Sequence, residues 1–254
     1  MTVGKIFAAG RPALIGYLPA GFPTVEGGIE AITAVVDAGV DAVEVGFPYS
    51  DPVIDGPVIQ RATEAALAAG VRPADVLRTV ERVAALGVPA VVMTYWNPME
   101  RYGVARFARD LAAAGGAGLI TPDLIPDEAG EWIAASDEHG LDRIFLVSPS
   151  STEARVRSTT AACRGFVYAT ALMGVTGARD QVSSDAPALV ERVRAVTRTP
   201  VAVGLGVRDG AQAAAIGAFA DGVIVGRALV AALAEGGIAA VAALTADLAA
   251  GVRA

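Results

Sequence analysis

The sequence predicts a single (β/α)₈ barrel, a fold in which parallel strands alternate with helices. Two observations lead to this prediction: eight short apolar runs recur along the 254 residues, and the segments between them carry helical spacing. A third observation, the absence of a Pro- or Ser-rich linker, indicates one domain over residues 1–254. Single barrels of this length are routine, so the length does not require a second domain.

The apolar runs are the predicted strands. Most are continuous rather than alternating in polarity, which is typical of parallel strands covered on both faces. In chain order, after an N-terminal extension, they span 13–18, 42–47, 90–95, 117–122, 143–148, 165–170, 200–205 and 221–226. An open doubly wound sheet is the alternative fold that this pattern allows.

Apolar residues between the strands fall on helical stripes. One stripe consists of Val104, Phe107, Ala108, Leu111 and Ala112. A second consists of Leu189, Val190, Val193 and Val196. Ser184 or Asp185 is expected to cap the second helix, with Pro187 in its first turn.

Composition argues against several function classes. The net charge of −7 and the pI near 4.8 disfavour nucleic acid binding, and no dense run of Lys and Arg offsets them. Cys163 is the only cysteine, which excludes an internal disulfide and a thiolate metal cluster. His139 is the only histidine and is expected at a helix end, in a structural or surface role, because histidine metal sites need several ligands together. We therefore predict no metal site.

The chain is expected to lie in the cytoplasm, without a membrane helix. Its longest uncharged window, 83–99, has 17 residues and is interrupted by prolines, so it falls short of a bilayer span. The N-terminal stretch lacks the ordered charged, apolar and small-residue regions of a secretion signal.

Two carboxylates stand where a barrel enzyme places its active site, at the carboxyl end of a strand and in the following loop. Glu44 lies inside the second apolar run, and Asp55 follows in the next loop. Residues two apart in a strand face the same side, so Glu44 is expected to face the same side as Ala42 and Gly46. The small size of these two neighbours leaves room for a ligand. A buried, unpaired carboxylate is costly, so Glu44 indicates a partner, an aqueous cavity or a chemical task. A structural pairing with a buried Arg is the alternative.

Glycines cluster after the last three predicted strands, in 173–180, 204–207 and 225–230. Glycine lets main-chain N–H groups approach an anion, and a helix that begins there adds favourable partial charge. Each segment alone is also compatible with a tight turn. Together, and in this order, they predict a phosphate site.

Six motifs, in order along the chain, resemble those of the tryptophan synthase alpha subunit family: PALIGYLPAGFPT, VEVGFPYSDPVIDGPVIQRA, MTYWNP, TPDLIPDEA, MGVTGAR and GLGV. The resemblance covers essentially the whole chain. It implies cleavage of indole-3-glycerol phosphate to indole and glyceraldehyde 3-phosphate in tryptophan biosynthesis. It also implies a beta subunit partner in an alpha-beta-beta-alpha complex, with pyridoxal phosphate expected only in that partner and no cofactor in this chain.

The same resemblance implies roles for single residues. Glu44 would be the catalytic acid/base, and Asp55 would receive the indole N–H. Tyr168 would hold the substrate and Glu44 through its hydroxyl, and Phe22 would pack against the indole. The backbones of Gly177, Gly206 and Gly226 would bind the phosphate. Asp123 would be a carboxylate for positioning or for signalling between subunits. Asp51 would lie in a loop that faces the beta subunit.

One position departs from the family pattern. Arg227 stands where the family usually has a serine after the last phosphate glycine. A guanidinium there could pair with the phosphate or point to solvent, and it opens the possibility of a specialised relative. The loops 49–60 and 174–185 are expected to be mobile and to become ordered on partner binding.

Three alternatives to the synthase subunit stay open. The chain could be a stand-alone lyase that releases free indole, or a non-catalytic activator of a beta subunit, although the retained Glu44 and Asp55 argue against the latter. It could also be another phosphate-binding barrel, such as an isomerase or the indole-glycerol phosphate synthase. Lys5 is the only lysine and precedes the first strand, which disfavours the synthase and excludes Schiff-base aldolase chemistry.

Overall fold

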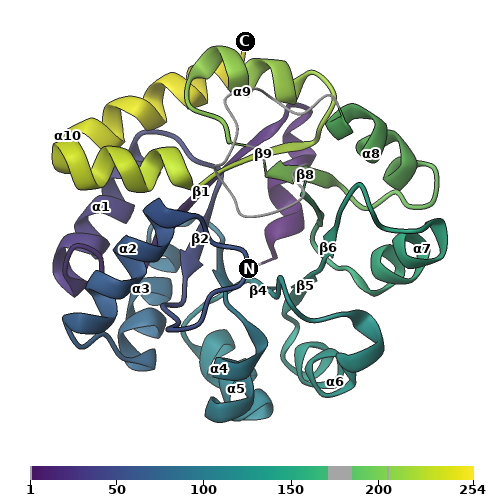
Figure 1. Cartoon of the computed structure of the whole chain (residues 1–254), viewed down its shortest axis with the longest axis horizontal. Helices are drawn as coiled ribbons and strands as arrows, with labels where there is room; N and C mark the ends of the chain where they lie inside the picture. The colour runs from purple at the N-terminus through teal and green to yellow at the C-terminus, as the bar shows by residue number, and fades with distance from the viewer. Residues whose placement is uncertain (1, 171–184, 205) are drawn as a thin grey trace.

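The computed structural model describes residues 2–170, 185–204 and 206–254, whose strands form one parallel sheet rolled into a barrel (Figure 1). Each strand is hydrogen-bonded to its neighbours in the order β5-β4-β3-β2-β1-β9-β8-β7-β6. The strands are β1 (Ala13–Pro19), β2 (Ala42–Gly46), β3 (Ala90–Met93), β4 (Gly118–Ile120), β5 (Asp142–Ile144), β6 (Leu146–Val147), β7 (Val167–Thr170), β8 (Val201–Gly204) and β9 (Gly222–Val225). The predicted barrel is confirmed, and the open sheet is not adopted.

The fifth predicted strand is divided in two, which explains a ninth strand in an eightfold barrel. β5 pairs with β4, whereas β6 pairs with β7. At the point of change, Ile144 accepts a hydrogen bond from the backbone N–H of Thr121 at 3.4 Å, and Phe145 accepts one from Tyr168 at 3.2 Å. The run 143–148 therefore joins the two edges of the sheet and closes the barrel.

The helices form a ring outside the strands (Figure 1). They are α1 (Val25–Asp37), α2 (Pro57–Ala68), α3 (Pro73–Ala85), α4 (Trp96–Tyr102), α5 (Val104–Ala113), α6 (Gly130–His139), α7 (Glu153–Ala162), α8 (Asp185–Arg194), α9 (Gly210–Gly217) and α10 (Arg227–Val252). Two 3₁₀ helices, η1 (Val3–Ala9) and η2 (Pro126–Glu128), complete the list of helices in the described residues.

Both predicted helical stripes face the core. In α5 the buried residues are Val104, Phe107, Ala108 and Leu111, and in α8 they are Ala186, Leu189, Val190 and Val193. Val196 lies beyond the end of α8 and is half-buried. α8 begins at Asp185, one of the two predicted capping residues, and Ser184 lies outside the described residues.

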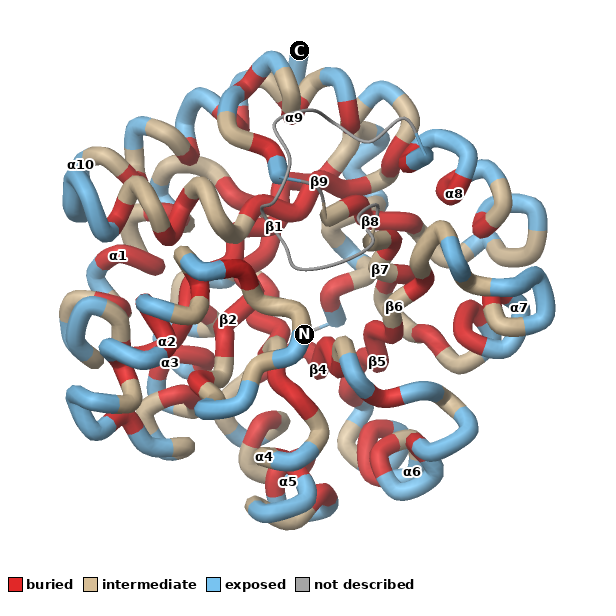
Figure 2. The backbone as a smooth tube through the Cα atoms, viewed as in Figure 1, coloured by how far each residue is buried: buried red, intermediate tan, exposed pale blue. Residues whose placement is uncertain are grey.

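Two apolar clusters fill the molecule, and the strands between them are almost wholly buried (Figure 2). The larger cluster lies between the strands and the helices. The smaller one fills the inside of the barrel and consists of Val3, Ile15, Ala42, Val91, Ala117, Ile120, Ile144, Phe166, Ala202 and Ile224. Because several of these residues start or precede strands, this inner core occupies the amino-terminal end of the barrel, and the opposite end is left for a site.

The N-terminal extension contributes to the inner core. Val3 of η1 is fully buried, and its backbone N–H donates to the Asp142 carboxylate at 2.7 Å. The Phe7 ring packs 5.8 Å from the Phe166 ring. The extension thus closes the amino-terminal end of the barrel.

Among the described residues, α10 is the one helix whose length and hydropathy would suit a membrane span. Glu235 and Asp247 interrupt its sequence, so it contains no long uncharged window. α10 bends at Gly237, where the backbone is not helical, and it packs against α1, α9 and β1. In this structure, therefore, its apolar residues, such as Leu229 and Leu248, cover the barrel.

Candidate active site

Glu44 is the most deeply buried acidic side chain of the described residues, at 1% exposure. It lies on β2 directly opposite Tyr17 on β1 and Val91 on β3. Glu44 stands two residues after Ala42, and residues two apart in a strand face the same side. Because Ala42 belongs to the inner core, Glu44 faces into the barrel as predicted. Its Oε1 atom has no hydrogen-bond partner in the described part of the chain. Burial raises the pKa of Glu44 from 4.5 to about 8, so the side chain is mostly protonated at neutral pH.

Asp55 lies in the loop between β2 and α2 and is half-buried. Its backbone carbonyl accepts a hydrogen bond from Gln60 Nε2 at 2.8 Å. The Tyr95 hydroxyl lies close enough to the Asp55 carboxylate to act on it as a donor. Burial raises the pKa of Asp55, and the hydrogen bond from Tyr95 opposes that rise. The two carboxylates of the β2 region therefore have different surroundings.

Tyrosines from three elements surround these carboxylates. Burial raises the pKa of Tyr17 and Tyr168, and the nearby charges of Asp55 and Glu44 raise both further. Burial, and then the nearby charge of Asp55, also raise the pKa of Tyr95, which precedes α4. The five side chains thus gather at one end of the barrel, the end at which the strands finish.

Glycines make room for two of the tyrosines. A Cβ atom on Gly46 would lie 2.4 Å from the Tyr17 hydroxyl oxygen, and one on Gly204 would lie 2.4 Å from the Tyr168 hydroxyl oxygen. Real Cβ atoms do not approach so closely. The strand-end glycines therefore allow the aromatic side chains to cross the mouth of the barrel.

Sequence reasoning identified Tyr168 but missed Tyr17 and Tyr95. Tyr17 stands in a fully buried strand, where burial alone gives no information about facing. The register that pairs Tyr17 with Glu44 would have indicated its position. Tyr95 lies in the motif MTYWNP that supported the family resemblance, but nothing in its local pattern connects it with Asp55.

The predicted phosphate region lies after β8 and β9. Gly206 is exposed, with no atom of the described residues within 4 Å of where a Cβ would stand, and Gly226 directly precedes α10. Gly177 lies outside the described residues. The glycine segments after β8 and β9 therefore lie close together, since β8 and β9 are neighbours in the sheet.

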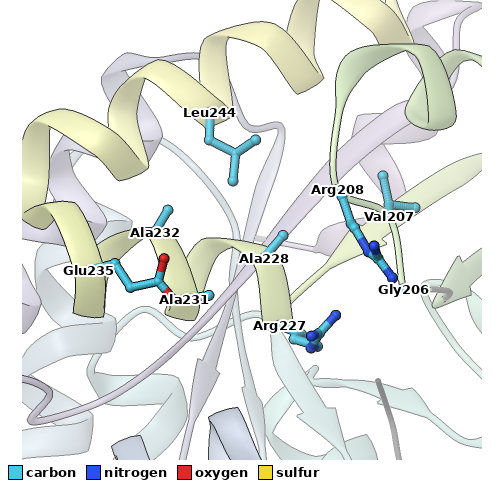
Figure 3. A pocket seen from close by; sticks show the side chains of 9 residues that line it. All are labelled: Gly206, Val207, Arg208, Arg227, Ala228, Ala231, Ala232, Glu235 and Leu244. Atoms are coloured by element: carbon cyan, nitrogen blue, oxygen red, sulfur yellow. The ribbon is translucent and has the colours of Figure 1, made fainter. Parts of the chain in front are cut away.

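Arg227, the first residue of α10, lines a cavity of about 320 Å³ together with Gly206 and Arg208. Figure 3 shows the Arg208 and Arg227 side chains directed toward the same space beside Gly206. Alanines of α10 and Glu235 form the other side of the cavity. The Arg227 guanidinium has no hydrogen bond or ion pair with another described residue. Its position beside the helix N-terminus makes this a cationic region suited to an anion.

The remaining predicted site residues lie around the rim. Asp123, after β4, is exposed and accepts the backbone N–H of Trp96 with both carboxylate oxygens, at 3.0 and 3.1 Å. Asp51 is exposed in the loop after β2 and accepts a hydrogen bond from Ser50. Phe22 is half-buried and packs against the outer cluster. These contacts give Asp123 a role in holding α4 and leave the proposed role of Phe22 as a prediction.

The described residues contain no group of three or more His, Cys, Asp and Glu side chains placed to hold a metal. His139 is the last residue of α6, a helix end as predicted. Cys163 is buried, and burial raises the pKa of its thiol to about 12, so the thiol is protonated at neutral pH.

Similarity to known proteins runs over nearly the whole chain. Residues 4–250 match the family model described as tryptophan synthase alpha chain. The tryptophan synthase alpha chain of Salinispora arenicola (strain CNS-205) is 67% identical over 254 residues, covering 98% of this chain and 95% of the relative. That of Mycobacterium avium (strain 104) is 65% identical, covering 99% of this chain and 94% of the relative.

Solved structures agree with the sequence relatives. A structure of Mycobacterium tuberculosis tryptophan synthase matches with a TM-score of 0.95 at 62% identity, over 99% of this chain and 98% of the matched chain. A mutant tryptophan synthase alpha-subunit from the hyperthermophile Pyrococcus furiosus matches with a TM-score of 0.86 at 31% identity, over 94% of this chain and 98% of the matched chain.

Proposed function

The chain belongs to the tryptophan synthase alpha chain family, and from this membership we propose that it cleaves indole-3-glycerol phosphate to indole and glyceraldehyde 3-phosphate. The observation that supports this activity most directly is Glu44, a buried carboxyl group without a partner among the described residues, at the mouth of a barrel that also holds Asp55. Cleavage of this substrate needs a group that donates and accepts protons, and an ionised carboxylate can stabilise the positive charge that develops on the indole.

Glu44 is proposed to move the protons of the reaction. Cleavage requires protonation of indole C3 and deprotonation of the side-chain hydroxyl as the carbon–carbon bond breaks. A carboxyl group with a pKa of about 8 can donate a proton and take one back near neutral pH. Burial among apolar residues is the cause of that pKa, which explains why the carboxylate stands inside a strand.

Asp55 is proposed to receive the indole N–H. As C3 is protonated, positive charge develops at the indole nitrogen, and an ionised carboxylate fixed at that position stabilises it. The hydrogen bond from Tyr95 favours the ionised form of Asp55. The two carboxylates can thus take different roles, and Tyr168, with its hydroxyl near both, is proposed to orient the substrate.

The substrate phosphate is proposed to bind at Gly206, Gly226 and the start of α10. Backbone N–H groups and the helix N-terminus favour an anion there. Arg227 is proposed to add a charge-assisted contact in place of the usual serine hydroxyl, since its guanidinium shares a cavity with Gly206. Gly177 keeps its predicted role but lies outside the described residues.

The proposed partner is the beta subunit of tryptophan synthase, in an alpha-beta-beta-alpha complex in the cytoplasm. Pyridoxal phosphate is expected to belong to that subunit, and the proton transfers proposed for Glu44 use only groups of this chain. Asp51 and Asp123, both exposed on the rim of the barrel mouth, are proposed to take part in contact or signalling between subunits.

The decisive experiment measures release of glyceraldehyde 3-phosphate from indole-3-glycerol phosphate by the purified chain, first alone and then with a beta subunit. We expect slow release that the beta subunit accelerates strongly. Fast release by the chain alone would instead identify a stand-alone lyase. No release under either condition, with acceleration of the beta reaction retained, would identify a non-catalytic activator.

A further inference from the structure

Tyr95 connects two loops at the barrel mouth. It is 5% exposed and stands between β3 and α4, as the residue that caps the N-terminus of α4. Its hydroxyl oxygen accepts the backbone N–H of Ile54 at 3.1 Å, and the hydroxyl lies close enough to the Asp55 carboxylate to lower its pKa as a donor. One side chain thus contacts both the backbone that precedes Asp55 and the carboxylate itself.

The first turn of α4 is itself held in place. The backbone N–H of Trp96, the next residue, donates to Asp123 in the loop after β4. Asn97 Nδ2 donates to the Tyr49 hydroxyl at 2.8 Å, and the Tyr49 ring packs 5.5 Å from the Tyr95 ring. The turn is therefore tied to the β4 loop on one side and to the β2 loop on the other, with Tyr95 between them.

We propose that Tyr95 is a positioning residue for the cleavage reaction, which holds the Asp55 carboxylate in the orientation that receives the indole N–H. This inference rests on the proposed function and extends it to a side chain that need not touch the substrate. The need for such a residue follows from the loop position of Asp55, because a carboxylate on a loop has more freedom than one on a strand.

The surroundings of Asp55 explain why a donor is needed. The described titratable groups that face it are Tyr17 from β1, Tyr168 from β7 and Tyr95 before α4. Glu44 on β2 also faces Tyr17 and Tyr168. No cation is among them. Burial favours the protonated form of Asp55, and the Tyr95 hydroxyl opposes this. Without that donor, a larger fraction of Asp55 would be neutral and unable to stabilise the indole cation.

Tyr95→Phe removes the hydroxyl and keeps the ring. We expect kcat to fall by roughly tenfold to a hundredfold, the effect of losing one hydrogen bond to a charged group. The acid limb of the kcat/KM profile should move to higher pH, because the pKa of Asp55 rises when a donor to its ionised form is lost. KM should change less than kcat, since the substrate phosphate lies elsewhere.

Tyr102→Phe is the matched control, because the Tyr102 hydroxyl donates to Asp110 at 2.8 Å at the other end of α4. It should keep the wild-type pH profile. If Tyr95→Phe does not fold, Asp123→Ala releases the same turn with Tyr95 in place, and in the chain assayed alone it should move the acid limb in the same direction by less.

A second readout separates failure of this inference from failure of the proposed function. Carbon-13 labelling of the Asp carboxyl groups reports the titration of Asp55 without substrate, and Tyr95→Phe should raise its pKa relative to wild type. An active wild type whose Asp55 titration and acid limb are unchanged in the variant would overturn the positioning role. An inactive wild type would overturn the proposed cleavage instead, and the titration would still decide whether Tyr95 controls Asp55.

Discussion

At the residue scale, the central feature is a glutamic acid whose environment favours its protonated form. Glu44 stands between apolar neighbours on an inner strand, and its pKa of about 8 results from burial alone. Asp55, in the next loop, is more accessible and has a hydroxyl donor. Chemical difference between two identical functional groups thus arises from position, which is how a barrel can combine an acid and a base at one pH.

Glu44→Gln tests both the chemistry and the burial. Turnover should fall by about 10²- to 10⁴-fold, because the amide cannot transfer protons. In contrast to turnover, the stability of the variant relative to wild type should increase at high pH. The folded-state pKa is raised from 4.5 to about 8, so the wild type loses stability progressively between those values, because the unfolded chain releases this proton while the folded chain retains it.

The amide variant lacks this loss. Its free energy of unfolding relative to wild type should therefore rise from pH 5 to pH 8, by at most about 1.4 kcal/mol per pH unit. Urea unfolding across this pH range measures the difference. Near-normal turnover in Glu44→Gln would remove Glu44 from the mechanism, and a pH-independent difference in stability would contradict its buried, neutral state.

Arg227→Ser restores the residue usual in the family. If the guanidinium contacts the substrate phosphate, KM for indole-3-glycerol phosphate should rise by roughly tenfold with little change in kcat, as expected for a charge-assisted hydrogen bond. The wild-type KM should also depend more steeply on salt than that of the variant. Arg227→Lys keeps the charge but lacks the planar guanidinium that can donate two parallel hydrogen bonds, so it serves as a control with an intermediate KM. An unchanged KM in Arg227→Ser would show that the side chain is a bystander.

At the element scale, strand ends determine what the barrel mouth can hold. Gly46→Ala should displace the Tyr17 ring, because the new Cβ would overlap the hydroxyl and the ring edge. We expect lower turnover and a loss of stability of about 1–3 kcal/mol from overpacking. Gly130→Ala, where the Cβ would meet nothing within 4 Å at the start of α6, is the control and should keep full activity. Normal kinetics in Gly46→Ala would show that Tyr17 can move without consequence.

Sequence patterns located the strands because short continuous apolar runs recur between segments of helical spacing, as in a parallel sheet covered by helices. They could not show that 143–148 divides at Phe145, because the change of pairing partner depends on strands distant in sequence. The same limit applies to the site. Glu44 was identified by its unusual chemistry in an apolar run, whereas Tyr17 looks like any buried aromatic until the register places it opposite Glu44.

At the scale of the whole molecule, the barrel separates stability from chemistry along its axis. The inner core and the N-terminal extension fill one end, and the carboxylates and the glycine segments after β8 and β9 occupy the other. The connection between Asp123, α4 and Asp55 runs around the rim of the second end. Contacts at that rim can therefore affect the site without passing through the core.

Val3→Ala tests this separation. Val3 is fully buried in the inner core at the end of the barrel remote from Glu44. Its truncation should lower the free energy of unfolding by roughly 1–3 kcal/mol and the Tm by several degrees, since it leaves a cavity in the inner core. Lys5→Ala, an exposed change in the same segment, should leave the Tm unchanged.

Turnover by folded Val3→Ala should equal that of wild type when both are measured well below the Tm. The reason is that Val3 belongs to the inner core at the amino-terminal end of the barrel, whereas the two carboxylates lie at its mouth. Thermal melts together with initial rates at one temperature give both quantities. A fall in turnover without a fall in Tm would mean that the closed end of the barrel controls the geometry of Glu44, and the two ends would then have to be treated as one unit.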